Sequence, residues 1–470
     1  MSNCTRICCV IACVLGVFNP VLAEDQLRRA DLMSVYQQAA INDAKLSAAR
    51  HAFGAQREAI PQARAGLLPT LSAGGAVEAV RLERDQPSLT RTRNQKVFQA
   101  NLNQPVFRLD RWFALEASQA STAQAELELS AKEQELMLSA AQAYFETLRA
   151  QDLLAASKAE EAALLRQQQQ AQARLDNGAS SITDLLDAQA AFDTATANRK
   201  LAERKVEDAF EGLSRLTKQR YSSIEAIAHQ LPIETPQPND SNVWVSRAVQ
   251  QNLALLASNY AVAAAEHTRS QRKAGFAPTL DAVVSYRKGD NDNFGYSNPT
   301  DFGRSGYYGD VAQRSVGLEL NIPLYSGGST RSQVREATER LAQSEDERED
   351  QRREVVQNVR NLHRAVNSDT EQVIARRQTI LSSQASVKAN QVGRELGSRN
   401  TADVLNAQRQ LYNAVRDYNN ARYDYIINTL KLKQAAGTLS PADLSSLAMY
   451  LTKNYDADRD FLPVDARNQR

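Results

Sequence analysis

The chain has 470 residues, 24% of them charged and 6% aromatic, and its 56 basic and 55 acidic side chains leave a formal net charge of +1. This balance gives no electrostatic basis for binding nucleic acid or for steering a charged partner from a distance. All four cysteines lie at or before Cys13, which excludes a disulfide framework or a cysteine-ligated metal site from the rest of the chain.

The first 23 residues are predicted to be a secretory signal peptide. Arg6 precedes an apolar run from Ile7 to Phe18, and Val21–Ala23 provides small residues for cleavage. The run is too short to span ~30 Å of hydrocarbon, which disfavours a membrane anchor. The residues that end at Cys13 loosely resemble a lipoprotein cleavage box. Only a handful of apolar residues precede this box, so lipidation of Cys13 is the less favoured alternative. We therefore expect cleavage after Ala23.

The rest of the chain contains an internal repeat. Three landmarks return in the same order: Ala65–Leu71 (AGLLPTL) as Ala274–Leu280 (AGFAPTL), Asn103–Phe107 (NQPVF) as Asn321–Tyr325 (NIPLY), and Gly178–Gln189 as Gly397–Gln408. A repeated order of landmarks predicts two copies of one structural unit. We place these units at residues 24–220 and 244–440, with a proline-rich linker or equatorial region at 221–243. An equatorial segment with a polar tail follows at 441–470, and the tail is expected to be disordered from Asn454.

Each unit begins with a helix and continues into a predicted β-hairpin, at about residues 69–106 and 278–324. Apolar positions alternate with polar ones over about nine residues, which is typical of a strand with one apolar and one polar face. They are Leu71, Ala73, Gly75 and Val77, then Phe98, Ala100 and Leu102, and in the second unit Leu280, Ala282, Val284 and Tyr286, then Val316, Leu318, Leu320 and Ile322. Strands of this length, when tilted, suit an outer-membrane barrel. Half-buried hairpins of a soluble sandwich are the alternative, which the signal peptide, the spacing and the flanking helices make less favourable.

Long helices follow both hairpins. The first is predicted at about 109–176 and the second at about 328–396, and residues 109–175 contain neither proline nor glycine. At 1.5 Å per residue each would be ~100 Å long, so that it needs partners along its length. Shorter helices are predicted at about 181–218 and 400–436. The alanine-rich composition allows the close helix approach of coiled coils and helical barrels.

Two hairpins supply four strands per chain, and four strands do not close a barrel. An open sheet edge in lipid leaves backbone groups without hydrogen-bond partners. If these strands lie in a membrane, several copies of the chain must therefore share one barrel. This argument does not determine the number of copies.

From about Leu32 to Leu451 the chain resembles the TolC family of outer-membrane channel-tunnels. The repeats carry this likeness together with Ala143–Glu146 (AYFE), Asn420–Tyr425 (NARYDY) and Ala435–Leu439 (AAGTL). The resemblance implies a mixed α+β membrane protein, a homotrimer whose 12-stranded outer-membrane β-barrel, with four strands per protomer, is continuous with a long α-helical periplasmic barrel. Within this family, the chain resembles the non-lipidated secretion and drug-efflux branch more than the lipidated one.

The resemblance also implies a function and partners. The chain would be a passive exit duct in outer-membrane lipid that extends into the periplasm and is gated at its periplasmic tip. It would pass small molecules or unfolded proteins from an inner-membrane pump of the ABC, resistance-nodulation-division or major-facilitator type, through a periplasmic adaptor. Neither the pump nor the cargo follows from the sequence.

The predicted tip has two turns, which are the expected adaptor-docking contacts: Asp176, Asn177 and Gly178 in the first, and Gly397 and Ser398 in the second. Each glycine is expected to end a helix. Ser181-x-x-Asp184 and Asn400-x-x-Asp403 then match capping boxes, which would account for both aspartates. A threefold assembly would also turn one inward carboxylate into a cation-attracting ring, and the two roles are compatible.

The resemblance implies gate residues at this tip. Asp403 matches the family's constricting aspartate, and Arg399 matches an arginine that ties one helix pair to its neighbour. Thr183 and Asp184 match the partners of that arginine. Two positions depart from the family: Asn406 stands where a second constricting aspartate is expected, and Arg394 where a latch tyrosine is expected. We expect a less acidic ring and a differently built latch.

Catalytic chemistry has little support in the sequence, and we predict neither enzymatic activity nor a cofactor. The four histidines are scattered without metal-binding spacing, and neither a GxSxG motif nor a phosphate-binding glycine loop is present. The main alternative is a periplasmic coiled-coil binding or scaffold protein without pore activity. An exported enzyme is a second alternative, but it would need a polar constellation that we do not find.

Overall fold

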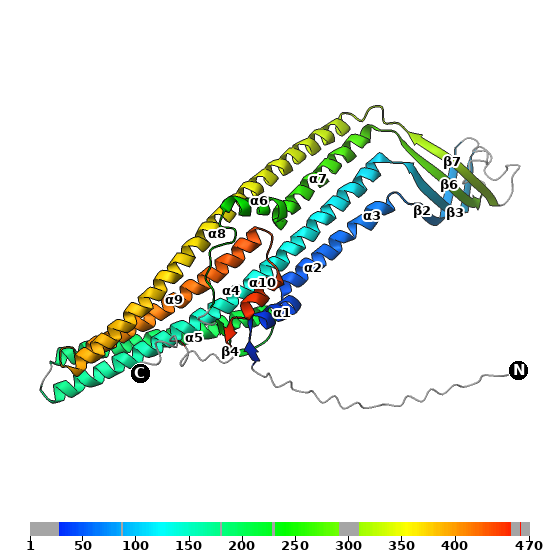
Figure 1. Ribbon diagram of the computed structural model, residues 1–470. Coiled ribbons are helices and arrows are strands. Elements are labelled where there is room, and N and C mark those ends of the chain that lie inside the picture. Colours follow the sequence, from blue (N-terminus) through cyan, green and yellow to red (C-terminus); the bar gives the residue numbers. More distant parts are fainter. Residues whose placement is uncertain are drawn as a thin grey trace, which may run out of the picture.

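The computed structural model describes residues 28–85, 88–178, 181–227, 231–290, 310–452 and 461. The molecule is long: a sheet stands at one end, helical turns stand at the other, and helices fill the length between them (Figure 1). The predicted signal peptide lies outside the described residues, as does the predicted polar tail apart from Phe461.

Two helices set the length of the molecule. Helix α4 spans Leu109–Asp176 (68 residues) and helix α8 spans Ser329–Glu395 (67 residues), and neither contains a proline. Each is therefore ~100 Å long at 1.5 Å per residue. They pack beside three further helices, α5 (Ile182–Thr217), α7 (Leu253–Lys273) and α9 (Thr401–Ala435). The described helices include no stretch apolar and long enough to cross a membrane.

The four long strands form one antiparallel sheet in the order β2-β3-β6-β7, with bounds β2 Thr70–Arg84, β3 Leu89–Phe107, β6 Thr279–Asp290 and β7 Asp310–Asn321. The register aligns the predicted apolar positions across the sheet. Leu71 faces Leu102, which faces Val284, which faces Val316. The outer members of this row are exposed, Leu71 by 75% and Val316 by 82%. The sheet thus presents apolar side chains that the described chain leaves uncovered.

Shorter elements lie along the long helices, from their middle to the end that carries the sheet (Figure 1). The helices are α1 (Leu32–Asn42), α2 (Ala44–Arg57), α3 (Ala59–Ala65), α6 (Ser241–Gln251) and α10 (Pro441–Ala448), with a 3-10 turn at Ala274–Phe276. The small strands are β1 (Arg28–Ala30), β4 (Tyr221–Ile224), β5 (Ala226–Ile227) and β8 (Leu451–Thr452). Strand β1 pairs with β4 in parallel, and β5 pairs with β8 antiparallel. We call β1, α1, β4, β5, α10 and β8 together the girdle.

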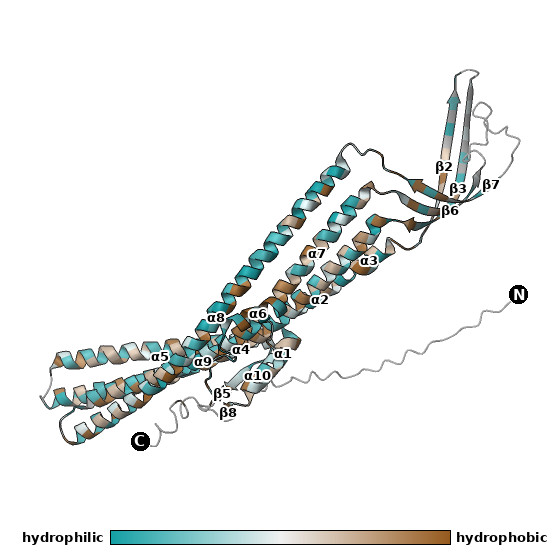
Figure 2. Cartoon of the chain, turned by 45° about the horizontal axis from the view of Figure 1, so that its top comes forward, coloured by the Kyte–Doolittle hydropathy of each residue, from teal (hydrophilic) through white to brown (hydrophobic). Residues whose placement is uncertain are grey.

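The largest core lies where the girdle meets α4 and α9. Tyr144 and Phe145 of α4 are fully buried there, and the Phe145 ring stacks on Tyr423 of α9 at 5.7 Å between centroids. The Tyr144 hydroxyl donates a hydrogen bond of 2.6 Å to the carbonyl oxygen of Glu225, between β4 and β5. Figure 2 shows apolar residues gathered at this level, whereas α8 is largely hydrophilic. This core therefore packs the linker region around Glu225 against α4 and α9.

Candidate functional site

The tip of the molecule is formed by two helical hairpins, α4–α5 and α8–α9, whose turns lie at the same end (Figure 1). Gly178 and Gly397 have φ angles of +70° and +73°, the left-handed conformation that ends a helix. The N–H of Ser398 donates to the carbonyl oxygen of Gly393 at 2.8 Å, which satisfies one of the last carbonyls of α8. The expected docking residues at both turns are exposed.

Both predicted capping boxes are present. The N–H of Asp184 donates to Ser181 Oγ at 3.2 Å, and the N–H of Ser181 donates to Asp184 Oδ2 at 3.2 Å. In α9 the N–H of Asp403 donates to Asn400 Oδ1 at 2.8 Å, and Asp403 Oδ2 accepts from the N–H of Asn400 at 3.1 Å. Each carboxylate thus lies at the positive end of its helix.

Arg399 stands between the second turn and the cap of α9, and its side chain is exposed. It lies against Gly393, where an added Cβ would be 2.7 Å from Arg399 Cγ. Because Gly393 has no side chain, the Arg399 side chain can lie against it. The sequence did not predict this contact.

The other expected gate residues occupy the same end of the chain. Thr183 Oγ1 lies 2.5 Å from Ser181 Oγ, so this side chain belongs to the cap of α5. Asp403 is half-buried, whereas Asn406, Arg394 and Asp184 are exposed. The fold therefore brings the expected gate residues to one end of the molecule.

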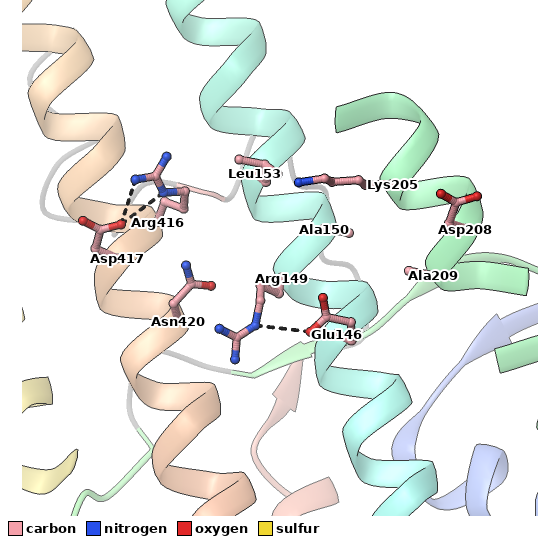
Figure 3. A pocket seen from close by; sticks show the side chains of 10 residues that line it. All are labelled: Glu146, Arg149, Ala150, Leu153, Lys205, Asp208, Ala209, Arg416, Asp417 and Asn420. Carbon is pink, nitrogen blue, oxygen red and sulfur yellow. Dashed lines mark hydrogen bonds and ion pairs between the residues drawn. The ribbon is translucent and has the colours of Figure 1, made fainter. Parts of the chain in front are cut away.

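Above the tip, α4, α5 and α9 form an open groove with charged walls (Figure 3). Arg149 of α4 pairs with Asp424 of α9 at 2.8 Å, and its Nε lies 3.4 Å from Glu146. Arg416 of α9 contacts Asp417 at 2.9 Å. The lining side chains include three cations, Arg149, Lys205 and Arg416, and three anions, Glu146, Asp208 and Asp417.

The groove and the girdle lie on opposite faces of α4. At 3.6 residues per turn, Glu146, Arg149 and Leu153 project away from the side that carries Tyr144 and Leu148. The latter pair is buried in the girdle core, whereas the former three line the groove. One face of α4 is therefore structural, and the other is polar and open. Sequence reasoning missed this groove, although charged residues at helical spacing on α4 were a signal for it.

The outer membrane efflux protein family model matches residues 35–217 and 244–438. The chain belongs to this family. It is 33% identical to outer membrane protein TolC of Vibrio cholerae, covering 88% of this chain and 92% of the relative. TolC of Escherichia coli is also 33% identical, over 90% of this chain and 85% of the relative. Alkaline protease secretion protein AprF of Pseudomonas aeruginosa is 27% identical, over 93% and 90%.

Solved structures share the fold of this outer membrane efflux protein. CusC superimposes with a TM-score of 0.73 and 16% identity, covering 87% of this chain and 93% of that chain. The Campylobacter jejuni CmeC outer membrane channel gives a TM-score of 0.72 with 14% identity, covering 96% and 98%. The efflux protein is thus an outer-membrane protein that extends into the periplasm. Its family and fold are those of channel proteins rather than of enzymes.

The described histidines of the efflux protein stand on three different helices. His363 is buried on α8, and His267 Nδ1 of α7 lies 3.0 Å from Glu116 of α4. His229 lies outside the described residues. Across the described ranges no group of three or more histidine, cysteine or acidic side chains is placed to hold a metal ion.

Proposed function

We propose that this protein is the outer-membrane exit duct of a tripartite export system, which passes small molecules or unfolded proteins out of the cell. The observation that carries the proposal is one sheet with exposed apolar side chains joined directly to helices ~100 Å long. An apolar sheet suits lipid, and a helical limb of that length suits the periplasm. Periplasmic adaptor and inner-membrane pump are the partners in this proposal.

The proposed assembly is a homotrimer. Strands β2 and β7 are the edges of the described sheet, and edges in lipid must be paired. Three copies that pair β2 with β7 of the next copy would close a 12-stranded barrel in outer-membrane lipid. The two halves of the chain, residues 24–220 and 244–440, would each supply one hairpin of strands and one hairpin of helices.

The proposed gate lies between copies. We assign the contact of Arg399 to the Thr183–Asp184 end of a neighbouring copy, because the family resemblance implies that an arginine at this position ties one helix pair to its neighbour. Asp403 of each copy would form the constricting ring and set its preference for cations. Asn406 would make that ring less acidic, and Arg394 would change the latch. The two tip turns, residues 176–178 and 397–398, are the proposed adaptor contacts.

The names of the relatives support a duct with more than one class of cargo. AprF and PrtF are named for protease secretion, and BepC of Brucella suis is named an outer membrane efflux protein. A single passive duct serves both classes if the pump selects the substrate. Deletion of the gene, followed by paired drug-susceptibility and secretome measurements, assigns the cargo.

Reconstitution tests the pore. The purified protein should be extracted from membranes only by detergent, run as a trimer on mild gels, and give discrete conductance steps in planar bilayers. A water-soluble monomer without conductance would contradict the proposal and favour the periplasmic scaffold instead.

A further inference from the structure

Strand β7 carries a column of exposed apolar side chains. Its members are Val316, Leu318 and Leu320 within the strand and Ile322 and Leu324 after it, with exposed fractions between 53% and 92%. Alternate residues of a strand point to the same face, so the column marks the apolar face of the sheet. It spans about 26 Å at ~3.3 Å per residue, which accounts for most of the ~25 Å apolar band of an outer-membrane barrel even when the strand is tilted.

Arg314 occupies the next position of this column, at the end of the sheet away from the helices (Figure 1). It is exposed and faces Tyr286 of β6 in the register. The guanidinium carbon Cζ lies 5.9 Å from the centroid of the Tyr286 ring, which in turn packs edge-on against Phe98 of β3 at 6.2 Å between centroids. The apolar column therefore ends in an arginine placed beside aromatic rings, as at the boundary between acyl chains and headgroups.

Lys288 of β6 is a second cation on this face. It faces Ala312 in the register, so it is a diagonal neighbour of Arg314. Diagonal neighbours have Cβ atoms about 7–8 Å apart, which lets two long side chains reach one anion. The Nζ of Lys288 lies 3.6 Å from Asp310 Oδ2, and the two side chains are 51% and 59% exposed. A contact of this length in water is weak, so the ammonium group can also bind an anion from outside the chain.

The cations at the other end of the sheet are engaged within the chain. Arg108 pairs with Asp110 at 3.1 Å and with Asp281 at 3.2 Å. Arg111 donates a hydrogen bond of 2.5 Å to the carbonyl oxygen of Gly66. These contacts lie where the strands join the helices, which extend into the periplasm. Arg314 and Lys288 instead stand at the end that faces the exterior of the cell.

We propose that Arg314 and Lys288 bind a phosphate of the lipopolysaccharide headgroup in the outer leaflet of the outer membrane. This rests on the proposed function, because it requires the sheet to lie in outer-membrane lipid. Lipopolysaccharide carries phosphates at the boundary between its acyl chains and its sugars, and clusters of basic residues at a membrane surface recognise anionic headgroups. A guanidinium group donates two parallel hydrogen bonds to a phosphate, and the ammonium group adds a point charge. The contact with Tyr286 positions the arginine before the lipid arrives.

Lipid binding to the full-length protein in detergent tests this proposal. The probes are diphosphorylated lipid A, the membrane anchor of lipopolysaccharide, and its dephosphorylated form, and native mass spectrometry measures their affinities. The wild type should bind the phosphorylated lipid about tenfold more tightly. Arg314→Gln and Lys288→Gln should each weaken that binding about fivefold, and the double variant about tenfold, because both changes affect one phosphate. Binding of the dephosphorylated lipid should not change in these variants.

Neighbouring positions supply matched controls. Arg287→Gln removes the cation directly before Lys288, but on the opposite face of β6, so it should leave lipid binding unchanged. Asp310→Asn removes the anion beside Lys288 and should tighten binding about twofold. Mobility on mild gels should be the same for every variant, which shows that none of them fails to assemble.

Three outcomes would overturn the lipid site. They are equal affinity of the wild type for the two lipids, wild-type affinity in the double variant, and loss of the preference for the phosphorylated lipid when inorganic phosphate is added, which would assign the two cations to a free anion. The failure of the proposed function looks different. A wild-type protein that gives no conductance in planar bilayers contradicts the duct, whereas normal conductance without a preference for the phosphorylated lipid contradicts the lipid site alone.

Discussion

The two helical hairpins have nearly equal dimensions but different surroundings. Their long helices have 68 and 67 residues, and both tips end in a left-handed glycine and a capping box. Helix α4 buries a row of alanines and aromatics against the girdle, whereas the upper part of α8 packs mainly on α7 and α6. Local sequence thus determines the length and the turns of each hairpin, whereas the elements packed against a hairpin determine which of its faces are buried.

The charged surface of α8 shows the same contrast. Glu349 accepts hydrogen bonds from Arg352 and Arg353, which lower the pKa of Glu349 to about 2. These three side chains are on one helix, with Arg352 and Arg353 exposed and Glu349 partly exposed, so their pairing adds little to stability. In α4, by contrast, the buried Asp152 accepts a hydrogen bond of 2.8 Å from the Tyr423 hydroxyl of α9. Helix α4 thus contributes buried groups to the core, whereas this stretch of α8 contributes charged groups at the surface.

The largest expected effect tests that assignment. Phe145→Ala should lower the free energy of unfolding by about 3–5 kcal/mol, because it empties a fully buried site in the girdle core. Val359→Ala, at an equally buried site of α8, should cost only about 2 kcal/mol. Thermal unfolding of both variants in one detergent provides the measurement. Equal losses would remove the contrast between the hairpins.

The next effect concerns the tip of the second hairpin. Arg399→Ala should raise the open-to-closed ratio about fivefold or more, because it removes the proposed contact between copies. Lys200→Ala, which removes an exposed cation of α5, is the control and should leave the ratio unchanged. Planar-bilayer conductance is the readout, and wild-type behaviour of Arg399→Ala would show that the latch lies elsewhere.

A smaller effect separates the two capping aspartates. Asp403→Asn should lower the cation-to-anion permeability ratio by about a factor of two, since a ring of charges sets selectivity. Asp184→Asn, at the matched position of the first hairpin, should change this ratio less. Reversal potentials in a salt gradient measure both. A larger change for Asp184→Asn would assign the constriction to α5 instead of α9.

The smallest effect concerns Asp369 of α8, whose pKa is raised by partial burial and by the nearby Asp424, while a hydrogen bond from Asn428 opposes the shift. A raised pKa means that the charged form is disfavoured in the folded protein. The stability linked to this group is present below its unfolded pKa and is lost as pH rises through the folded value. Asp369→Asn should therefore raise the Tm by about 1–2 °C at neutral pH, and the difference from wild type should shrink below about pH 4. An unchanged or lower Tm at neutral pH would contradict this account.

The sequence alone determined the local structure of both halves. The strands follow from alternation of apolar residues such as Leu71 and Val316, and the helix ends follow from Gly178, Gly397 and their capping boxes. These features depend on residues within a few positions of each other, because helix and strand periods are local. The family resemblance rested on the same local patterns and is confirmed by the family match.

Only the tertiary structure decided which faces of these elements are covered. The stack of Phe145 on Tyr423 and the pair of Arg149 with Asp424 join residues more than 270 positions apart. Phe461 is likewise buried, and its ring stacks on Tyr412 of α9. No local period of the sequence predicts such contacts, because they depend on how the helices pack against each other and against the rest of the chain.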